Sequence, residues 1–295
     1  MKKRSIKLTV AALTLSLIAM GAAACTPSDT SDEGDSAETV DTPEPTTVVI
    51  AGSTSVQPLS EMLAETYMGD HPEVSIEVQG GGSGQGIKSI EEGLADFGAL
   101  SRELKSEEEA VAAEQFVIAK DGIAVIVNSD SDVSDITVDQ LLKIYTGEIT
   151  NWSEVGGSDA KINVVTREEG SGTRDAFGEL TGVVGKDENG DTVDNTVESA
   201  IVQGSTGAVI QTVSTTPDSI GFASLGAVDS SVKSLKVEGV EASNETVLSG
   251  EYKISRPFLY ICGSDPAEQA RAFVDFIFSS EGQAIVEEAG FIAVK

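Results

Sequence analysis

The stretch TREEGSGTR, residues Thr166–Arg174, sets the interpretation of the whole chain. The apolar run Ile162–Val165 before it predicts a buried strand, and Asp175–Leu180 after it can begin a helix. The free N–H groups and the dipole of a helix's first turn favour an anion, and hydroxyl and guanidinium groups add further donors. The pattern therefore predicts either an oxyanion site or a capped helix beside a surface ion pair, and this stretch alone leaves both open.

The same order of strand, hydroxyl-rich turn and helix recurs along the chain. Gly52–Ser55 follows an apolar strand and precedes a helix with Pro58 in its first turn, where proline costs no hydrogen bond. Gly80–Gly86 and Gly204–Gly207 precede two more helices. The glycine run at 80–86 has neither the G-x-G-x-x-G register nor the Gly-Lys-Ser/Thr ending of nucleotide sites. It favours a loop in which a small ligand approaches backbone N–H groups.

Alternation of strands and helices predicts an α/β fold with mostly parallel sheets, whose ligands bind at the carboxyl ends of the strands. One predicted helix is acidic, and its run Glu107–Glu109 is expected to face solvent. The predicted strands are Val48–Ala51, Val74–Val78, Ala95–Leu100, Phe116–Ala119, Gly122–Asn128, Ile162–Val165, Ser219–Leu225, Val232–Val240 and Tyr252–Cys262. The predicted helices are Val56–Tyr67, Ile87–Leu94, Glu103–Ala113, Ile136–Tyr145, Asp175–Leu180, Ala208–Val213, Ala267–Ser279 and Glu281–Ala289.

Composition excludes several classes of protein. The 295 residues, enough for two domains, carry 19 Lys plus Arg against 49 Asp plus Glu, a formal net charge of −30, which argues against a nucleic-acid partner. His71 is the only histidine, so most histidine-based catalysis and zinc chemistry are excluded, and no metal or cofactor is expected. The acidic stretch Asp187–Asp194 lacks the glycine that an EF-hand turn requires, which favours an exposed turn over a calcium site. Cys262 ends an apolar run and is expected to be a buried thiol.

The first 24 residues have the features of a secretory signal. A basic segment, Lys2–Arg4, precedes the mostly apolar run Leu8–Met20, which is too short for a stable membrane span. Cys25 follows small residues and resembles the lipidation site of a bacterial lipoprotein, although Ala22 stands where leucine is more usual. Residues 1–24 are therefore expected to be a lipoprotein signal peptide, with ordinary cleavage beside an incidental cysteine as the alternative.

The segment after Cys25 is almost free of apolar side chains. Thr26–Thr46 is rich in Asp, Glu, Ser, Thr and Pro, so it cannot bury enough surface to offset its ordering entropy. Residues 25–46 are expected to be a lipidated cysteine and a disordered acidic tether. The protein would then lie outside the cytoplasm, attached by lipid to the outer face of the cell membrane.

Four motifs, in this order and spacing, resemble the phosphate-binding proteins of bacterial Pst ABC transporters, in their shorter lipoprotein form. The resemblance runs from Val48 to the C-terminus, and Ser219–Leu225 and Ser255–Pro257 extend it. The four motifs are Gly52–Pro58, Gly82–Lys88, Asp96–Arg102 and Arg167–Thr173.

This resemblance implies a two-lobed clamshell of the type II periplasmic-binding-protein-like class, each lobe a mostly parallel sheet flanked by helices. Residues 47–124 with 258–295 would form lobe I, and residues 125–257 would form lobe II. The strands Gly122–Asn128 and Tyr252–Cys262 would be the two hinge crossings.

The resemblance also implies a phosphate site between the lobes. Arg167 would be the buried cation, with Glu169 holding its guanidinium group from the second shell. Longer relatives have an aspartate that accepts a proton from phosphate, where this chain has Leu100-Ser101-Arg102. Because Ser101 can accept a hydrogen bond but carries no charge, we expect weaker discrimination against sulfate than in those longer relatives. The residues expected to contact phosphate are Thr54, Ser55, Ser83, Ser101, Arg167, Ser171, Gly172 and Thr173.

The implied function is binding without catalysis, by a monomer that delivers inorganic phosphate to the membrane permease subunits of an ABC importer. A binding protein for another oxyanion, molybdate or sulfate, is the main alternative. A secreted phosphatase is the other, and it would need a nucleophile with a base or a metal cluster, which the sequence does not supply.

Overall fold

The computed structural model describes residues 45–294, which lie within one compact unit, Pro43–Lys295. The predicted signal peptide, the lipidation of Cys25 and the tether fall outside these residues, except for the tether's last two positions, which lie at the start of the described chain. Over residues 45–294, none of the helices has the length and apolar character needed to span a bilayer.

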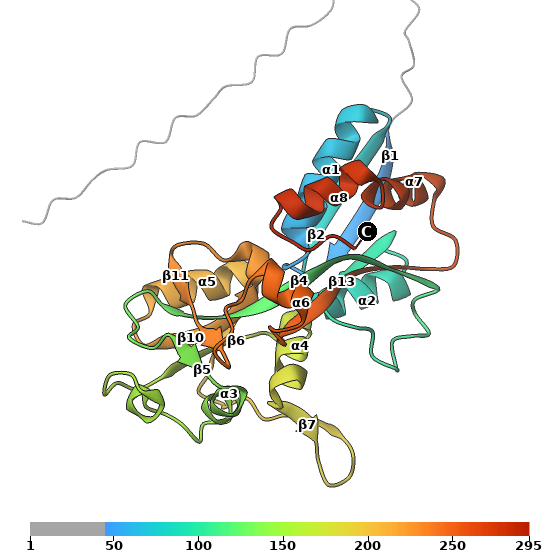
Figure 1. Cartoon of the computed structure of the whole chain (residues 1–295). Coiled ribbons are helices and arrows are strands. Elements are labelled where there is room, and N and C mark those ends of the chain that lie inside the picture. The colour runs from blue at the N-terminus through green and yellow to red at the C-terminus, as the bar shows by residue number, and fades with distance from the viewer. Residues whose placement is uncertain (1–44, 295) are drawn as a thin grey trace, which may run out of the picture. The chain divides into compact units, whose positions relative to one another are not determined.

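The main sheet has nine strands and is mixed rather than mostly parallel (Figure 1). Along the sheet the order is β2-β1-β3-β13-β4-β10-β6-β9, and β11 also pairs with β4. Pairs at the two ends, β1 with β2 and β3, and β6 with β9 and β10, are parallel. The pairs that β13 makes with β3 and β4, and that β4 makes with β10 and β11, are antiparallel. The bounds are β1 Thr46–Gly52, β2 Val74–Gly80, β3 Phe97–Leu100, β4 Glu114–Asn128, β6 Asn163–Arg167, β9 Ile201–Gln203, β10 Ser219–Ser224, β11 Val232–Ser234 and β13 Ser255–Cys262.

Strand β4 replaces two predicted strands with one of 15 residues. Its first part, Glu114–Gly122, pairs with β13, and Ile123–Val127 pairs with β10. The strand therefore runs from one group of elements into the other without a break.

Two large hydrophobic cores lie along this sheet, and a small apolar cluster of Ile87, Leu100, Leu259 and Ile261 lies beside the first. The first core is built by residues 48–119 and 258–291, and it packs under α1, α7 and α8. The second core is built by residues 123–254 with Ile292, and it packs under α3, α4 and α5. The helices are α1 Gln57–Asp70, α2 Ser83–Glu91, α3 Val138–Tyr145, α4 Gly172–Thr181, α5 Thr206–Thr215, α6 Asn244–Ser249, α7 Glu268–Ile277 and α8 Ser280–Glu288. The short elements are η1 Trp152–Val155, η2 Leu225–Ala227, β5 Asp135–Ile136, β7 Val184–Lys186, β8 Thr192–Asp194 and β12 Lys236–Val237.

The chain passes between the cores beside a buried ion pair. Arg256 of β13 donates from its η2 nitrogen to Asp121 Oδ2 of β4 at 3.0 Å, and both side chains are almost fully buried. Burial raises the pKa of the Asp121 carboxyl, although Arg256 opposes this, and burial lowers the pKa of Arg256. The two strands are thus joined by a charge pair as well as by their backbones.

One predicted helix is absent, and one residue of the run predicted to face solvent turns inward, while Glu107 and Glu109 are exposed as predicted. Residues 103–113 form no helix, and only residues 106–111 are in turns. Glu108 does not face solvent, because its two carboxylate oxygens accept from the two terminal nitrogens of Arg102 at 2.6 and 2.7 Å. Cys262 is a buried free thiol, as predicted.

Candidate functional site

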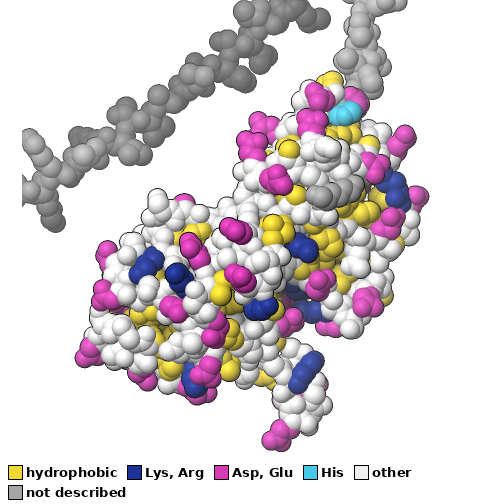
Figure 2. All heavy atoms as spheres, viewed as in Figure 1, with side chains coloured by type: hydrophobic (Ala, Val, Ile, Leu, Met, Phe, Trp, Pro, Cys, Tyr) yellow, Lys and Arg dark blue, Asp and Glu magenta, His cyan; other side chains and the backbone are white. Residues whose placement is uncertain are grey.

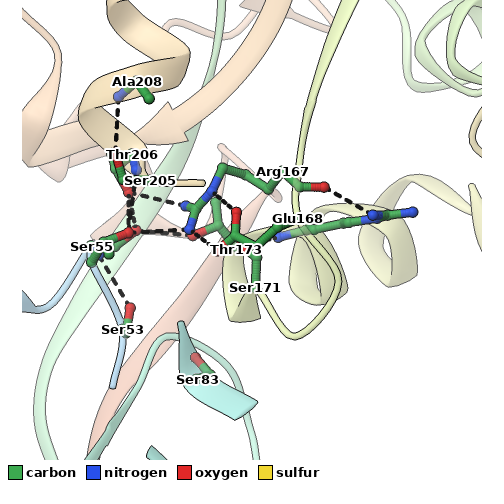
Figure 3. A network of polar contacts seen from close by, with 12 residues as sticks. Ser53, Ser55, Ser83, Arg167, Glu168, Ser171, Thr173, Ser205, Thr206 and Ala208 are labelled. Carbon is green, nitrogen blue, oxygen red and sulfur yellow. Dashed lines mark hydrogen bonds and ion pairs between the residues drawn. The ribbon is translucent and has the colours of Figure 1, made fainter. Parts of the chain in front are cut away.

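Four turns that each precede a helix meet between the two cores, and Figure 3 shows their side chains pointing toward one another. They come before α1, α2, α4 and α5, and the end of β3 joins them. The hydroxyls of Ser171 and Ser205 cap α4 and α5 by accepting from the N–H groups of Arg174 and Ala208. Parallel strands thus bring several helix N-termini to one edge of the sheet, as the repeated pattern predicted.

Hydroxyl contacts cross from the first core to the second. Ser55, before α1, lies 2.9 Å from Thr173 at the start of α4 and 2.8 Å from Thr206 at the start of α5, measured between hydroxyl oxygens. All three residues are at most 3% exposed. The cluster is therefore shielded from water, where a hydrogen bond to an anion is strong.

A second group of hydroxyls belongs to the first core. Ser53 donates to the Ser101 hydroxyl at 2.8 Å, and the Ser101 backbone N–H donates to Ser83 Oγ at 3.1 Å. Gly172 faces these side chains so closely that an added Cβ would lie 2.2 Å from Ser83 Oγ. Glycine at this position lets the first turn of α4 reach the serines.

Arg167 ends β6 inside this cluster, with 1% of its surface exposed. Its two terminal nitrogens donate to Thr206 at 3.2 Å and to Thr54 at 3.1 Å. The arginine therefore supplies a buried positive charge among neutral donors.

The guanidinium of Arg167 is held by Glu168, and the prediction that Glu169 does so is wrong. Both carboxylate oxygens of Glu168 accept from Arg167 at 2.7 Å. The Glu168 N–H donates to the Gln203 carbonyl of β9, so the backbone at Glu168 continues alongside that strand. Its side chain turns back toward Arg167. Glu169 lies in the following turn and is exposed.

Thr206 is a central residue that the motifs did not identify. It contacts Thr54, Ser55 and Arg167, and so links the turn before α1 to the buried arginine. Its signal was present in the turn Gly204–Gly207, a hydroxyl-rich turn before a helix, but that turn matched none of the family motifs. Ser53, which bonds Ser101, belongs to a predicted turn but was likewise not assigned a role.

The other arginines nearby are used by the protein itself. Arg102 is paired with Glu108 and Asp175, and Arg174 is paired with Asp194. Arg174 also donates to the carbonyl of Arg167 at 2.9 Å, which fixes the end of β6.

The cluster has the chemistry of an anion receptor. Its groups are hydroxyls, helix-start N–H groups and one arginine, all of which donate hydrogen bonds. Between residues 45 and 294, no group of His, Cys, Asp and Glu side chains could hold a metal ion. The single histidine, His71, lies apart, stacked on Tyr67 beside Glu73.

Comparison with known proteins gives consistent similarities. Residues 37–281 match the PBP superfamily domain. The phosphate-binding protein PstS of Bacillus subtilis is 34% identical over 252 residues, which cover 84% of this chain and 80% of that protein. A putative phosphate ABC transporter substrate-binding protein from Clostridium perfringens, solved with bound phosphate, is 43% identical, with a TM-score of 0.79 over 84% of this chain and 100% of that one. An ABC-type phosphate transport receptor from Vibrio cholerae is 38% identical, with a TM-score of 0.70 over 83% and 99% of the two chains.

Proposed function

Because the chain belongs to the PBP superfamily and, within it, to the PstS phosphate-binding proteins, we propose that it binds inorganic phosphate and delivers it to an ABC importer. It acts as a receptor and not as an enzyme. The solved relative from Clostridium perfringens, which carries phosphate, supports this ligand.

The observation that carries the proposal is the buried cluster around Arg167. A dehydrated dianion needs many donors and a positive charge in one enclosed place, because burial without them is costly. Thr54 and Thr206 accept from the guanidinium, and Ser55 contacts Thr206. Ser83 and Ser101 lie beside Gly172 in α4's first turn. Phosphate held here would accept from Thr54, Ser55, Ser83, Ser171, Gly172 and Thr173 as well as from Arg167.

The two cores would be the two lobes of a clamshell that closes over the anion. The boundaries of the two cores support chain crossings between them near residues 119–123 and 254–258. These positions lie close to the expected lobe boundaries, with lobe I at 47–124 and 258–295 and lobe II at 125–257. In this proposal the short stretches of β4 and β13 at the crossings bend, while each core moves as a unit.

The remaining parts of the proposal concern attachment and partners. Lipidation of Cys25 would hold the protein, a monomer, at the outer face of the cell membrane. There it would meet the permease subunits, and the tether of residues 25–46 would allow it to reach them.

Ser101 makes sulfate and molybdate the alternatives to consider. Its hydroxyl can accept the proton of hydrogen phosphate, but without the charge of an aspartate it repels a proton-free anion less. Phosphate is favoured because a phosphate-bound relative shares 43% of its residues with this chain.

Equilibrium dialysis of labelled phosphate, with competition by arsenate, sulfate and molybdate, tests the proposal. Arsenate should compete with phosphate, whereas sulfate and molybdate should compete only at much higher concentrations. A thermal shift with molybdate but none with millimolar phosphate would overturn it.

A further inference from the structure

A cluster of ion pairs joins the two cores beside the anion cluster. Arg102, directly after Ser101, donates from Nε to Asp175 Oδ2 of α4 at 2.9 Å. Lys105 lies 2.9 Å from the same oxygen. The Arg102 side chain is 4% exposed and that of Asp175 is 19% exposed, so water weakens their attraction little.

Glu108, which belongs to the same part of the chain as Arg102, fixes the orientation of the guanidinium group for this contact. Its carboxylate binds both terminal guanidinium nitrogens, and the carbonyl of Glu103 accepts a further bond at 2.8 Å. Burial alone would lower the pKa of Arg102, but Glu108 and Asp175 raise it, so the guanidinium stays charged. With its other nitrogens held, Nε is left directed at Asp175.

Asp175 lies two residues after Thr173, in the first turn of the helix that contributes to the anion cluster. Two residues before α4 begins, the Gly170 carbonyl accepts from the Gly84 N–H of α2 at 2.9 Å. Gly84, Arg102, Gly170 and Asp175 line a cavity of about 830 Å³. The first core is therefore bonded both to the residues just before α4 and to the first turn of α4, next to a water-accessible space.

We propose that the Arg102–Asp175 ion pair is a clamp between the two cores that sets how slowly the bound anion leaves. The clamp rests on the proposed function, since it acts on the same site. Separation of the cores would break the bond to Asp175, whereas Arg102 would keep Glu108. Opening then breaks the contacts that Arg102 and Lys105 make to Asp175. Because Arg102 keeps its bonds to Glu108, it is not left as an unpaired buried charge, so the clamp is reversible.

Release of labelled inorganic phosphate into excess unlabelled phosphate tests the clamp in four proteins: the wild type, Asp175→Asn, Arg102→Gln and the double variant. Each single variant should release phosphate about 10-fold faster, with Asp175→Asn at least as fast as Arg102→Gln because it also removes the contact with Lys105. The double variant should be no faster than Asp175→Asn, because without Asp175 the Arg102 side chain has no partner on the second core to lose. Association should change less than twofold. Multiplied effects in the double variant, or an unchanged release rate in Asp175→Asn, would overturn the clamp.

Asp194→Asn is the matched control. Asp194 also accepts from an arginine of α4, Arg174, at 2.7 Å, but it belongs to β8 and its partner lies on the same core. This variant should release phosphate at the wild-type rate. If Asp175 only stabilised the start of its helix, Asp175→Asn would lower the unfolding midpoint as much without phosphate as with it.

Hydrogen exchange of the Gly84 amide, with and without phosphate, separates the clamp from the ligand. Of the two conditions, one will give the slower exchange of the Gly84 amide in the wild type. In that condition Asp175→Asn should raise the exchange rate about 10-fold, and Asp194→Asn should leave it unchanged. If the wild type bound no phosphate but Gly84 still exchanged faster in Asp175→Asn than in the wild type, phosphate would be excluded as the ligand and the clamp would stand. Equal exchange in all proteins under both conditions would remove the clamp whatever phosphate does.

Discussion

Arg167 shows how one side chain can serve both the fold and the anion. Glu168 fixes its orientation through two bonds, while its terminal nitrogens stay among hydroxyls that can turn toward a ligand. A hydroxyl can rotate from donating to a neighbour to donating to an anion, since its proton is free to move. The cluster can thus satisfy its own hydrogen bonds and those of a bound anion.

Arg167→Ala should abolish phosphate binding. It leaves a buried anion without its countercharge and Glu168 without its partner, a loss of about 4 kcal/mol, or about 1,000-fold in affinity. Equilibrium dialysis measures the change. Arg271→Ala, which removes an exposed arginine paired with Glu114, should bind like the wild type, and unchanged affinity in Arg167→Ala would exclude this residue from the site.

Ser101→Ala should weaken phosphate binding about 10-fold and leave sulfate binding unchanged, because only phosphate at neutral pH has a proton that needs an acceptor. Competition dialysis with both ions measures the two affinities in the same protein. Equal losses for both ions would mean that Ser101 supports the turn instead of reading the proton.

At this scale the sequence predicted residue types better than pairings. The hydroxyl turns were recognisable from their repeated place between a strand and a helix, and the role of Arg167 came from the resemblance to the family. The choice between Glu168 and Glu169 was not, since both follow Arg167 and only the course of the chain beside β9 distinguishes them. Thr206 had the right turn chemistry but lay in no motif, so nothing in the sequence tied it to Arg167.

Among the elements, β4 and β13 differ most from the prediction. Apolar periodicity located both strands, but the antiparallel direction of β13 depends on its pairing with β3 and β4, distant in sequence. The predicted helix at Glu103–Ala113 is absent, and Glu108 turns inward to Arg102, a contact that a local count of acidic residues does not reveal. The spacing of apolar residues thus predicts where strands and helices form, and pairing between distant segments determines the order and direction of the strands.

Asp121→Asn should lower the free energy of unfolding by about 3–5 kcal/mol, because Arg256 would remain buried without its countercharge. Urea unfolding measures the change. Asp139→Asn removes the same kind of carboxylate from an exposed pair with Lys143 and should cost less than about 0.5 kcal/mol. Similar losses in the two variants would show that the crossing does not depend on this pair.

For the whole molecule, charge is the dominant surface property. Figure 2 shows acidic side chains spread over the visible face, with fewer basic ones among them. A formal charge of −30 opposes compactness by self-repulsion, and a buried anion adds to it. Local donors around Arg167 must therefore outweigh an unfavourable overall field.

The unfolding temperature should rise as NaCl increases from 0.1 to 1 M, since the screening length falls from about 10 Å to about 3 Å. Calorimetry of the phosphate-free protein measures it. Near the sequence pI of about 4.1 the effect should vanish, because little net charge remains to screen. A midpoint that falls with salt at neutral pH would show that attractive ion pairs, and not repulsion, govern stability.

The split composition of the first core has a consequence for how the protein is made. Nearly all of the second core comes from one uninterrupted segment, 123–254, while the first core needs residues on both sides of that segment. Wherever the chain emerges with its N-terminus first, nearly all of the second core is present while β1 and α1 still wait for β13, α7 and α8. The usual N-terminal-first order of folding is therefore reversed, and the earliest strands to be synthesised are the last to be covered.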